Sequence, residues 1–514
     1  MSLNLADALE IAAEKRPDSE ALVFDDTRMT FAQVAKAARR LAAALHERGV
    51  GPGDKVAFLI PNTPHFPIIL YGVLYTGATA VPMNVLLQWR EISYQLEEAD
   101  VTTLFAFGPL QEQAVRAFQA SPKCRRLFVV EPGTTPSSPE TGESFLKMMA
   151  SGSPDFEPYR TNPDDTAEIL FTSAYGGKPL GTELTHFNLF QNALISQAFV
   201  QQFTSEDVCL CALPLFHSFG QTAMLNAPLL GTSKVILMPR FETHKVFEII
   251  ARERVTLFGV VPSMAHFMIH YKPSEHFDLS SIRALDVGGS ALPLETHEAF
   301  LERFNIPLLQ GYGLTETSPV VAYNVDEATN RPGSVGKPIF HCQVRIRRAD
   351  DSFAAPGEAG EIVVRGHNVM KGYYKKPAET ADALRDGWMH TGDLGYLDED
   401  GYLYLTGLKK DLIIRAGMNI YPREIEEILL LHPDVEEAAV IGVPEHVRGE
   451  EVCAVLVSSS QTPPDEKALR AHCFEYLAQF KCPRKFEFIH ALPRTNSGTI
   501  DKSALRRQFS RRHT

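Results

Sequence analysis

Hydrophobic and polar positions along the first hundred residues predict helices separated by short strands. Thr30 and Gln33 have the spacing of a capping box before an alanine-rich segment, and Gly49 is placed to end that helix. The apolar run of residues 55–60 then predicts a buried strand. The same order recurs as helix 66–74 and strand 78–82, then helix 92–99 and strand 102–106. Helices alternating with short apolar strands predict a doubly wound α/β unit.

The pattern changes further along the chain. Residues 131–165 are rich in Pro, Ser, Thr, Gly and Asp, which predicts a surface connection before a second α/β unit. From about Gly333, short runs with turn signals predict a β-rich module with strands at 344–347, 360–365 and 401–405. The C-terminal part predicts a compact α+β domain, with helices 422–431 and 465–477 and strands 437–443 and 451–457. The predicted class is α/β, with two doubly wound subdomains and a small β-rich subdomain in a large N-terminal domain.

Composition narrows the function classes. The 514 residues are 44% hydrophobic and 22% charged, with a formal net charge of −13, which argues against a general binder of nucleic acid or anionic membranes. A basic tail at 506–513 is interpreted as favourable cations at the end of a terminal helix. The seven scattered cysteines contain no CxxC pair, which indicates a reducing cytoplasm and no structural zinc. No apolar run approaches about 18 residues, so we expect neither secretion nor an integral membrane segment.

Residues 171–186, FTSAYGGKPLGTELTH, have the build of a phosphate-binding loop. Thr172 and Ser173 offer hydroxyls after an apolar strand, and the glycines allow close backbone approach to an anion. The P-loop of ATPases is excluded, because Pro179 follows Lys178 where Ser or Thr is required. Taken alone, the segment is equally typical of an ordinary glycine-rich turn.

Four further segments carry functional groups where strands are expected to end. Residues 286–293 place two glycines after an apolar strand and could form a flat ledge for a planar base or a plain tight turn. Residues 310–317, QGYGLTET, combine an aromatic face, a hydroxyl and a carboxylate. Residues 388–393 end in Asp393, which could accept both hydroxyls of a ribose or form an Asx turn. Residues 493–502 form a polar loop.

Together, in this order and at these separations, the segments resemble the adenylate-forming superfamily of acyl-CoA and aryl-CoA synthetases, firefly luciferase and adenylation domains. The likeness covers nearly the whole chain and is greatest to fatty-acid–CoA ligases of long and medium chain length. Supporting matches are the segments 213–217 (LPLFH), 331–336 (RPGSVG), 366–373, 417–426 (GMNIYPREIE) and 480–493.

The resemblance implies the activity and its cofactors. Such enzymes use ATP and Mg²⁺ to convert a carboxylic acid into an acyl-adenylate, and coenzyme A then displaces AMP. By this resemblance Glu316 would bind Mg²⁺ and Thr315 the phosphates, Tyr312 would stack on adenine, and Asp393 would hold the ribose. The remaining nucleotide-binding positions would be Thr172, Ser173, Gly176, Gly177, Lys178, Gly288, Gly289, Ser290, Gln310 and Gly311.

The resemblance also implies a division into an AMP-binding domain, 1–409, and a mobile C-terminal domain, 410–514, with a hinge near Lys410. In similar enzymes the small domain rotates between the half-reactions. This rotation exchanges a catalytic lysine loop for the segment that begins at Gly417, which lines the pantetheine tunnel.

The chain departs from the family pattern around the phosphates. Ala174, Tyr175, Gly176 and Leu180 replace Gly, Thr, Thr and Lys of the phosphate loop. Leu408 replaces an arginine, and Thr499 occupies the position of the catalytic lysine. Each preorganised donor is typically worth about 10²–10³ in rate, so we expect slow adenylation. Lys178 and Lys502 are alternative cations, or are simply solvated surface lysines.

The acid is expected to be hydrophobic, and a fatty acid is favoured. His217 is either a gate beside the acyl pocket or a structural histidine. The residues expected to line the acyl tunnel, or else to be ordinary core, are Phe258, Val260, Val261, Met264 and Val320. The sequence favours an acyl-CoA ligase over a degenerate binder of nucleotide or acyl-CoA, or an enzyme that forms only the thioester. It does not decide between a monomer and a homodimer.

Overall fold

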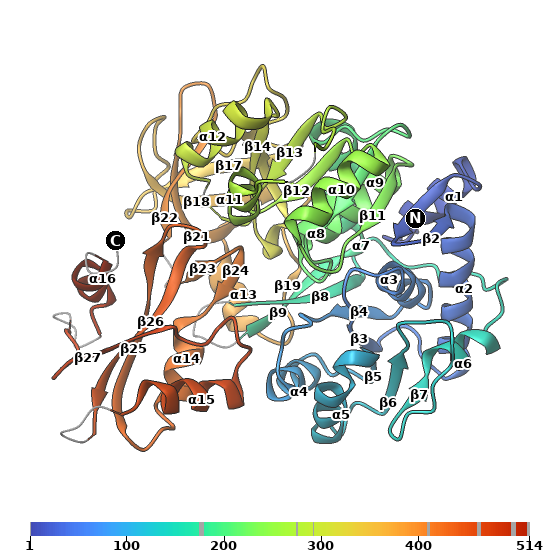
Figure 1. Cartoon of the computed structure of the whole chain (residues 1–514), viewed down its shortest axis with the longest axis horizontal. Coiled ribbons are helices and arrows are strands. Elements are labelled where there is room, and N and C mark those ends of the chain that lie inside the picture. The colour runs from blue at the N-terminus through green and yellow to red at the C-terminus, as the bar shows by residue number, and fades with distance from the viewer. Residues whose placement is uncertain are drawn as a thin grey trace.

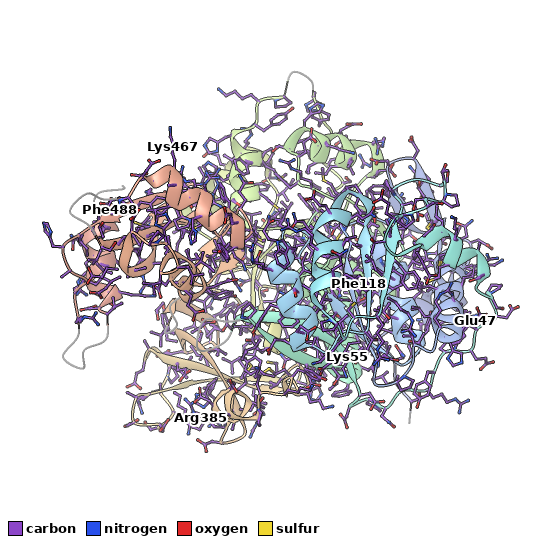
Figure 2. All side chains as sticks on the ribbon, turned by 90° about the horizontal axis from the view of Figure 1, so that it is seen from below. Glu47, Lys55, Phe118, Arg385, Lys467 and Phe488 are labelled. Atoms are coloured by element: carbon purple, nitrogen blue, oxygen red, sulfur yellow. The ribbon has the colours of Figure 1, made fainter. Side chains whose placement is uncertain are left out.

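The structure is a computed structural model that describes residues 2–173, 179–273, 276–290, 292–408, 412–459, 464–494 and 500–510. A large N-terminal domain occupies most of the molecule, and a smaller C-terminal domain lies beside it, coloured orange to red in Figure 1. Figure 2 shows the same division from below, with Lys467 and Phe488 in the small domain and Glu47 and Phe118 in the large one.

The first sheet contains the strands predicted near the N-terminus. Its central strands are parallel, and β9 and β19 extend it in antiparallel order. Its order is β19 (Gly372–Tyr373), β9 (Pro179–Thr185), β8 (Thr166–Ser173), β4 (Thr79–Pro82), β3 (Lys55–Leu59), β5 (Thr103–Phe107), β6 (Arg126–Val130) and β7 (Glu143–Ser144).

The second sheet is also parallel at its centre and antiparallel at both edges. Its order is β16 (Lys337–Pro338), β15 (Val320–Tyr323), β14 (Leu308–Gly313), β13 (Ala284–Val287), β12 (Leu257–Val260), β10 (Val208–Cys211), β11 (Lys234–Leu237), β1 (Glu20–Phe24) and β2 (Thr27–Thr30). The predicted doubly wound units are therefore present, with antiparallel edge strands that the sequence pattern does not predict.

Helices cover both sheets in layers. The capping box of Thr30 and Gln33 is formed at the start of α2, and Gly49 follows its end with a φ of +76°. The helices between the sheets share the largest core, and they are α1 (Asp7–Lys15), α2 (Phe31–Glu47), α3 (His65–Tyr75), α6 (Phe145–Ser151), α7 (His186–Ile195) and α9 (Ala227–Leu230). The outer face of the first sheet carries α4 (Trp89–Glu98) and α5 (Gln111–Ala120). The outer face of the second carries α10 (Thr243–Glu253), α11 (Pro262–His270) and α12 (Leu294–Phe304).

The predicted β-rich module is a five-stranded antiparallel sheet. Its strands are β17 (Cys342–Arg347), β18 (Gly360–Gly366), β20 (Leu384–Arg385), β21 (Trp388–Leu397) and β22 (Leu403–Leu408), and α13 (Pro377–Ala383) lies before β20. Short helical segments elsewhere are η1 (Gly108–Leu110), η2 (Ser196–Val200), α8 (Ser218–Gln221), η3 (Thr222–Asn226) and η4 (Thr315–Thr317).

The C-terminal domain has the predicted α+β build. Its strands are β23 (Ile413–Arg415), β24 (Met418–Ile420), β25 (Val435–Glu445), β26 (Gly449–Ser458) and β27 (Lys485–Phe488). One face of this sheet packs on α14 (Pro422–Leu429) and α15 (Glu466–Tyr476), and the other packs on α16 (Lys502–Ser510). The predicted α/β class, with a large N-terminal domain and a smaller α+β domain, is confirmed.

Two local predictions need correction. Residues 131–165 are not only a surface connection, because they contain β7 and α6, whose Phe145 and Met148 are buried. The segment 171–186 is not strand, loop and helix, because β9 follows the loop and pairs back on β8 before Thr185 caps α7. Within the described ranges, no helix is long and apolar enough to cross a membrane. All seven cysteines are free and buried.

Candidate active site

Tyr312 and Asp393, predicted to contact adenine and ribose, come together between the second sheet and the β-rich module. Tyr312 lies on β14, and its hydroxyl donates a hydrogen bond to Asp393 Oδ2 on β21 at 2.6 Å. Asp393 is 9% exposed, and its backbone N–H donates to Thr391 Oγ1. Burial and the neighbouring Asp393 raise the pKa of Tyr312, so the phenol stays protonated. Two motifs far apart in the chain therefore form one hydrogen-bonded unit.

Asp393 does not lie at a strand end, contrary to the sequence expectation. It sits within β21, which continues to Leu397, and its backbone pairs in register with Leu408 of β22. Because a pair directly across two antiparallel strands is close, a cation at position 408 would lie beside the ribose position. Position 408, where the family resemblance implies an arginine, therefore lies directly across the sheet from Asp393.

Glu316, the predicted metal ligand, lies in the short segment η4 and is 3% exposed. Its Oε1 accepts a hydrogen bond from the Tyr373 hydroxyl at 3.0 Å, and its backbone carbonyl accepts one from Met370. In the part of the chain that the structure describes, no group of three or more His, Cys, Asp or Glu side chains could hold a metal ion. One carboxylate fits Mg²⁺, which in nucleotide sites is held by one or two carboxylates together with phosphates and water.

The glycine ledge follows β13, as predicted. Gly289 is exposed and has a φ of +81°, a conformation that favours glycine. A side chain at Gly288 would approach the Phe219 ring to about 3.0 Å, so the backbone here lies flat against an aromatic residue. Ser290 is half-buried beside this ledge.

Gln310 and Gly311 lie on the adjacent strand β14, where Gln310 is 7% exposed. Thr315 begins η4 next to Glu316.

The phosphate side is a β-hairpin. Thr172 and Ser173 end β8, and Thr172 pairs in register with Leu180 of β9. Leu180 is 6% exposed and belongs to the largest hydrophobic core. The position where a cation was expected is therefore occupied by a core side chain. The predicted contacts of Gly176, Gly177 and Lys178 lie outside the described residues, as do those of Lys410 and Thr499.

The chain on either side of residues 495–499 belongs to the far face of the C-terminal domain. Arg494 pairs with Glu437 of β25, and its backbone bridges to Ile500. Lys502 pairs with Glu426 at 2.6 Å, so it is an engaged side chain. Figure 1 shows α16 on the side of the small domain that faces away from the large domain. The Lys502 side chain is therefore directed to Glu426 of α14 within the C-terminal domain.

Gly417 faces the N-terminal domain instead. Its φ is +77°, and a side chain there would approach Val261 Cγ1 to 2.7 Å. The Cα of Gly417 also lies 4.0 Å from the point where a side chain of Gly289 would begin. The segment predicted to line the pantetheine tunnel is thus packed against the adenine ledge.

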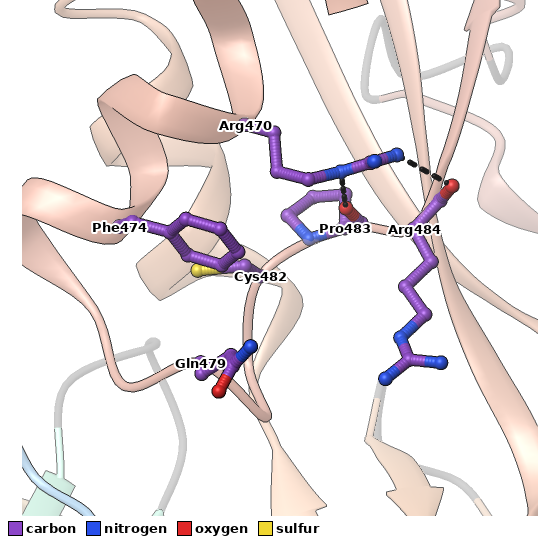
Figure 3. A pocket seen from close by; sticks show the side chains of 6 residues that line it. All are labelled: Arg470, Phe474, Gln479, Cys482, Pro483 and Arg484. Carbon is purple, nitrogen blue, oxygen red and sulfur yellow. Dashed lines mark hydrogen bonds between the residues drawn. The ribbon is translucent and has the colours of Figure 1, made fainter. Parts of the chain in front are cut away.

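An interdomain cavity of about 460 Å³ lies nearby. The wall formed by the N-terminal domain is mainly apolar. The wall formed by the C-terminal domain includes Arg415, Phe480 and Arg484. Arg415 Nε lies 2.8 Å from Glu451 and Arg484 lies 3.9 Å from the same residue, so one carboxylate faces two guanidinium groups. A second cavity, of about 310 Å³, shares Gln479 and Arg484 with the first (Figure 3). There Arg470 donates to the carbonyls of Pro483 and Arg484.

Of the residues predicted for the acyl side, some lie near the site and others lie in the core. His217 precedes α8, and burial lowers its pKa, so the imidazole is neutral at pH 7. Phe258 and Val260 are fully buried in the core of the second sheet. Val261 lies at the end of β12 against Gly417, which places it at the site. Val320 is 7% exposed, and Met264 packs against two cores.

The sequence did not predict that Tyr373 contacts Glu316 or that Arg415 lines the interdomain cavity. Tyr373 ended a matching segment and gave no separate signal, because its partner Glu316 is 57 residues away. Arg415 lies two residues before Gly417, and a basic residue beside the predicted tunnel was an available signal.

Comparison with known proteins shows the family to which the chain belongs. Residues 9–374 match the family model of the AMP-binding enzymes, and residues 424–499 match the model of the AMP-binding enzyme C-terminal domain. A long-chain-fatty-acid–CoA ligase of Bacillus subtilis is 34% identical, covering 99% of this chain and 95% of the relative. A feruloyl-CoA synthase of an Amycolatopsis species is 36% identical, covering 97% of each chain.

Solved structures are similar over the whole length. The o-succinylbenzoate CoA synthetase of Bacillus subtilis, a double mutant bound to the product analogue OSB-NCoA, is 30% identical with a TM-score of 0.85, covering 97% of this chain and 98% of its own. An anthranilate CoA ligase in complex with anthranoyl-AMP is 26% identical with a TM-score of 0.76, covering 100% and 98%. The chain therefore belongs to the AMP-binding enzyme family and, within it, to the AMP-forming acyl-CoA and aryl-CoA ligases.

Proposed function

We propose that the chain activates a hydrophobic carboxylic acid, a fatty acid in the first instance, and that thioester formation is its better preserved half-reaction. The observation that carries this proposal is the packing of Gly417 against Val261 and Gly289, which sets the tunnel segment beside a preassembled adenosine site. The boundary between residues 1–409 and 410–514 remains a prediction, as do the roles assigned to individual site residues.

In this proposal Asp393 accepts hydrogen bonds from the ribose hydroxyls, and Tyr312 presents its ring to adenine while its hydroxyl fixes Asp393. Glu316 binds Mg²⁺, which neutralises phosphate charge, and Tyr373 orients that carboxylate. We assign the hydroxyls of Thr172, Ser173 and Thr315 to the phosphates, as the family resemblance implies. Held hydrogen-bond partners need no reorganisation when the ligand binds, which favours binding of the adenylate.

Coenzyme A is proposed to enter through the interdomain cavity. Arg415 and Arg484 supply positive charge for its anionic nucleotide, and the lack of a side chain at Gly417, which lies against Val261, favours close approach of the pantetheine arm.

The hydrophobic character of the acid is supported by the apolar side chains near the site, which include Val261, Met264 and Phe219. The test is acyl-CoA formation from ATP, Mg²⁺ and coenzyme A with a panel of fatty, aromatic and short polar acids. We expect turnover with fatty acids above that with aromatic acids, and none with a sulfonated acid. Turnover confined to polar acids would contradict the proposed substrate class.

The packing of Leu180 in the core favours a second candidate, a binder that no longer forms the adenylate. It predicts tight binding of acyl-adenylate and no product from either substrate set. Formation of acyl-CoA from supplied acyl-adenylate would exclude it.

A further inference from the structure

Polar contacts join α4 of the N-terminal domain to the segment 475–481 of the C-terminal domain. Glu91 Oε1 accepts a hydrogen bond from Lys481 Nζ at 2.6 Å. Its Oε2 accepts one from the backbone N–H of Ala478 at 2.9 Å and one from that of Gln88 at 2.8 Å. A single carboxylate thus receives donors from both domains and also caps its own helix.

The neighbouring Arg90 makes a second connection. Its guanidinium donates to the carbonyl of Glu475 at 2.7 Å. It also lies over two aromatic rings, with distances of 4.6 Å to the centroid of Trp89 and 4.5 Å to that of Tyr476. Because Tyr476 belongs to the other domain, this cation–π contact crosses the interface as well.

Lys481 is held between carboxylates of the two domains. It is 5% exposed, and Glu424 of α14 lies 2.8 Å from its Nζ, opposite Glu91. Burial alone would lower the pKa of Lys481, but Glu424 and Glu91 outweigh burial and raise it, so the ammonium group stays charged. Removal of one partner from such a buried pair leaves an uncompensated charge and is strongly unfavourable.

These contacts border the interdomain cavity. Gln88 and Ile92, on either side of Glu91, line it from α4, and Phe480 and Arg484, on either side of Lys481, line it from the C-terminal domain. The ion pair of Glu91 and Lys481 therefore fixes the separation of the two cavity walls. In the same arrangement Gly417 packs against Val261.

We propose that Glu91 is a positioning residue for thioester formation, which acts through Lys481 and Ala478 to hold the C-terminal domain with Gly417 at the adenine ledge. Glu91 has no part in adenylation, because the small domain must leave this position for the other half-reaction. The inference rests on the proposed function, since it assigns Glu91 to one of its two half-reactions.

The experiment measures domain position and chemistry separately. Spin labels on Gln119→Cys in α5 and Lys467→Cys in α15, both exposed positions, report the interdomain distance by pulsed EPR, because all native cysteines are buried. We expect one dominant distance in the parent protein and a broadened, shifted distribution in Glu91→Gln. The single-turnover rate of acyl-CoA formation from acyl-adenylate should fall at least tenfold in Glu91→Gln, while the adenylation rate changes less than twofold.

The matched control is Glu98→Gln. It makes the same change on the same helix, but Glu98 pairs with Lys376 of the N-terminal domain at 2.8 Å. This control should leave distances and both rates unchanged. Lys481→Met should reproduce the effect of Glu91→Gln, and the double variant should be no worse than the more impaired single variant. If Glu91→Gln does not fold, Arg90→Ala removes an exposed side chain and should slow thioester formation about threefold.

Unchanged distances and an unchanged thioester rate in Glu91→Gln and Lys481→Met would overturn the inference, as would an equal loss in both half-reactions. Failure of the proposed function would look different. The parent protein would then form no thioester, whereas the label distances would still show whether Glu91 holds the domain.

Discussion

The adenosine side and the phosphate side of the site differ in how their polar groups are held. On the adenosine side, Tyr312 of β14 is hydrogen-bonded to Asp393 of β21, so that two regular strands hold the pair. On the phosphate side, Leu180 packs in the core at the position of an expected cation. The strand that leads to this loop also contains Glu168, a fully buried carboxyl.

The difference teaches that binding and activation are separable in this fold. Hydrogen bonds that hold adenosine need only be present in the ground state, whereas adenylation needs positive charge where negative charge develops. In the proposed function the chain keeps the hydrogen bonds for adenosine and lacks cations that the family resemblance implies for adenylation. Glu91 and Lys481 meanwhile hold the C-terminal domain in an arrangement that does not need those cations.

The largest expected effect is a gain on the phosphate side. Thr499→Lys should raise the adenylation rate about 100-fold, because it restores a preorganised cation near the developing charge. Thioester formation should change little, since Gly417 faces the site in the described arrangement. Pyrophosphate release is the measurement, with Thr495→Lys as the control. An unchanged adenylation rate would contradict the view that position 499 limits it.

The buried carboxyl of Glu168 predicts a pH-dependent stability. Burial raises its pKa to about 8, and the nearby Gln221 lowers it only in part. Between pH 4.5 and 8 the unfolded chain releases a proton that the folded chain keeps, so the free energy of unfolding falls as pH rises.

Glu168→Gln should abolish this fall. The free energy of unfolding of the variant, compared with that of the parent, should therefore be about 3 kcal/mol higher at pH 7 than it is at pH 4.5. Denaturant titrations at several pH values measure it. Glu183→Gln on the neighbouring strand, where Thr166 donates to the carboxylate, is the control. Equal slopes with pH in parent and Glu168→Gln would refute the assignment.

On the adenosine side, Asp393→Ala should weaken ATP binding about 100-fold, because two charge-assisted hydrogen bonds to ribose are lost. Calorimetry measures the affinity. Asp386→Asn, at an exposed turn residue paired with Arg347, is the matched control and should bind normally. A loss below threefold in Asp393→Ala would mean that the ribose is held elsewhere.

Tyr312→Phe isolates the hydroxyl from the ring. It should weaken ATP binding about fivefold, since one hydrogen bond to Asp393 is lost while stacking is kept. In the double variant with Asp393→Ala the Tyr312 change should add little, because the shared bond is already gone. Full additivity would show that the two residues act independently.

The smallest expected effect concerns domain docking at acidic pH. His266 of α11 faces His270 on its own helix and His446 and Glu445 of the C-terminal domain, and its ring centroid is 5.4 Å from that of His446. Burial and the two neighbouring imidazoles lower the pKa of His266, whereas Glu445 raises it. Docking therefore disfavours the protonated form, and the docked fraction should fall about twofold as pH drops below about 6.5.

The interdomain label distance, followed with pH, measures this fraction. His266→Gln should remove most of the dependence. His276→Gln, which changes an exposed histidine that is not among the groups acting on His266, should retain it. An identical pH profile in parent and His266→Gln would exclude this histidine as the cause.

The sequence predicted the elements well but not the contacts between distant ones. Capping at Thr30 and the strand at 55–60 are local signals, and the structure confirms both. The strand β9 was missed because Pro179 and Gly181 are typical of loops. Proline is tolerated at the first residue of a strand, and Gly181 lies where a side chain would approach Ile169 to 2.7 Å.

The site was predicted as a set of motifs rather than as a geometry. The family resemblance placed Tyr312 and Asp393 at one nucleotide, but their direct bond joins residues 81 positions apart and leaves no local pattern. Glu91 and Lys481 are 390 positions apart, and each is an ordinary charged residue in its own segment. The sequence showed that Leu180 departs from the family's phosphate-loop pattern. It did not show that Leu180 is buried, because this burial depends on the hairpin of β8 and β9.

The most direct test compares two substrate sets on one preparation by single-turnover kinetics. One reaction receives synthetic acyl-adenylate and coenzyme A, and the other receives ATP, Mg²⁺, the same fatty acid and coenzyme A. We predict that both reactions form acyl-CoA. The reaction with acyl-adenylate should be faster by about 100-fold or more, because only the reaction with ATP depends on the cations that the chain is expected to lack. Equal rates, or product from the second set alone, would contradict it.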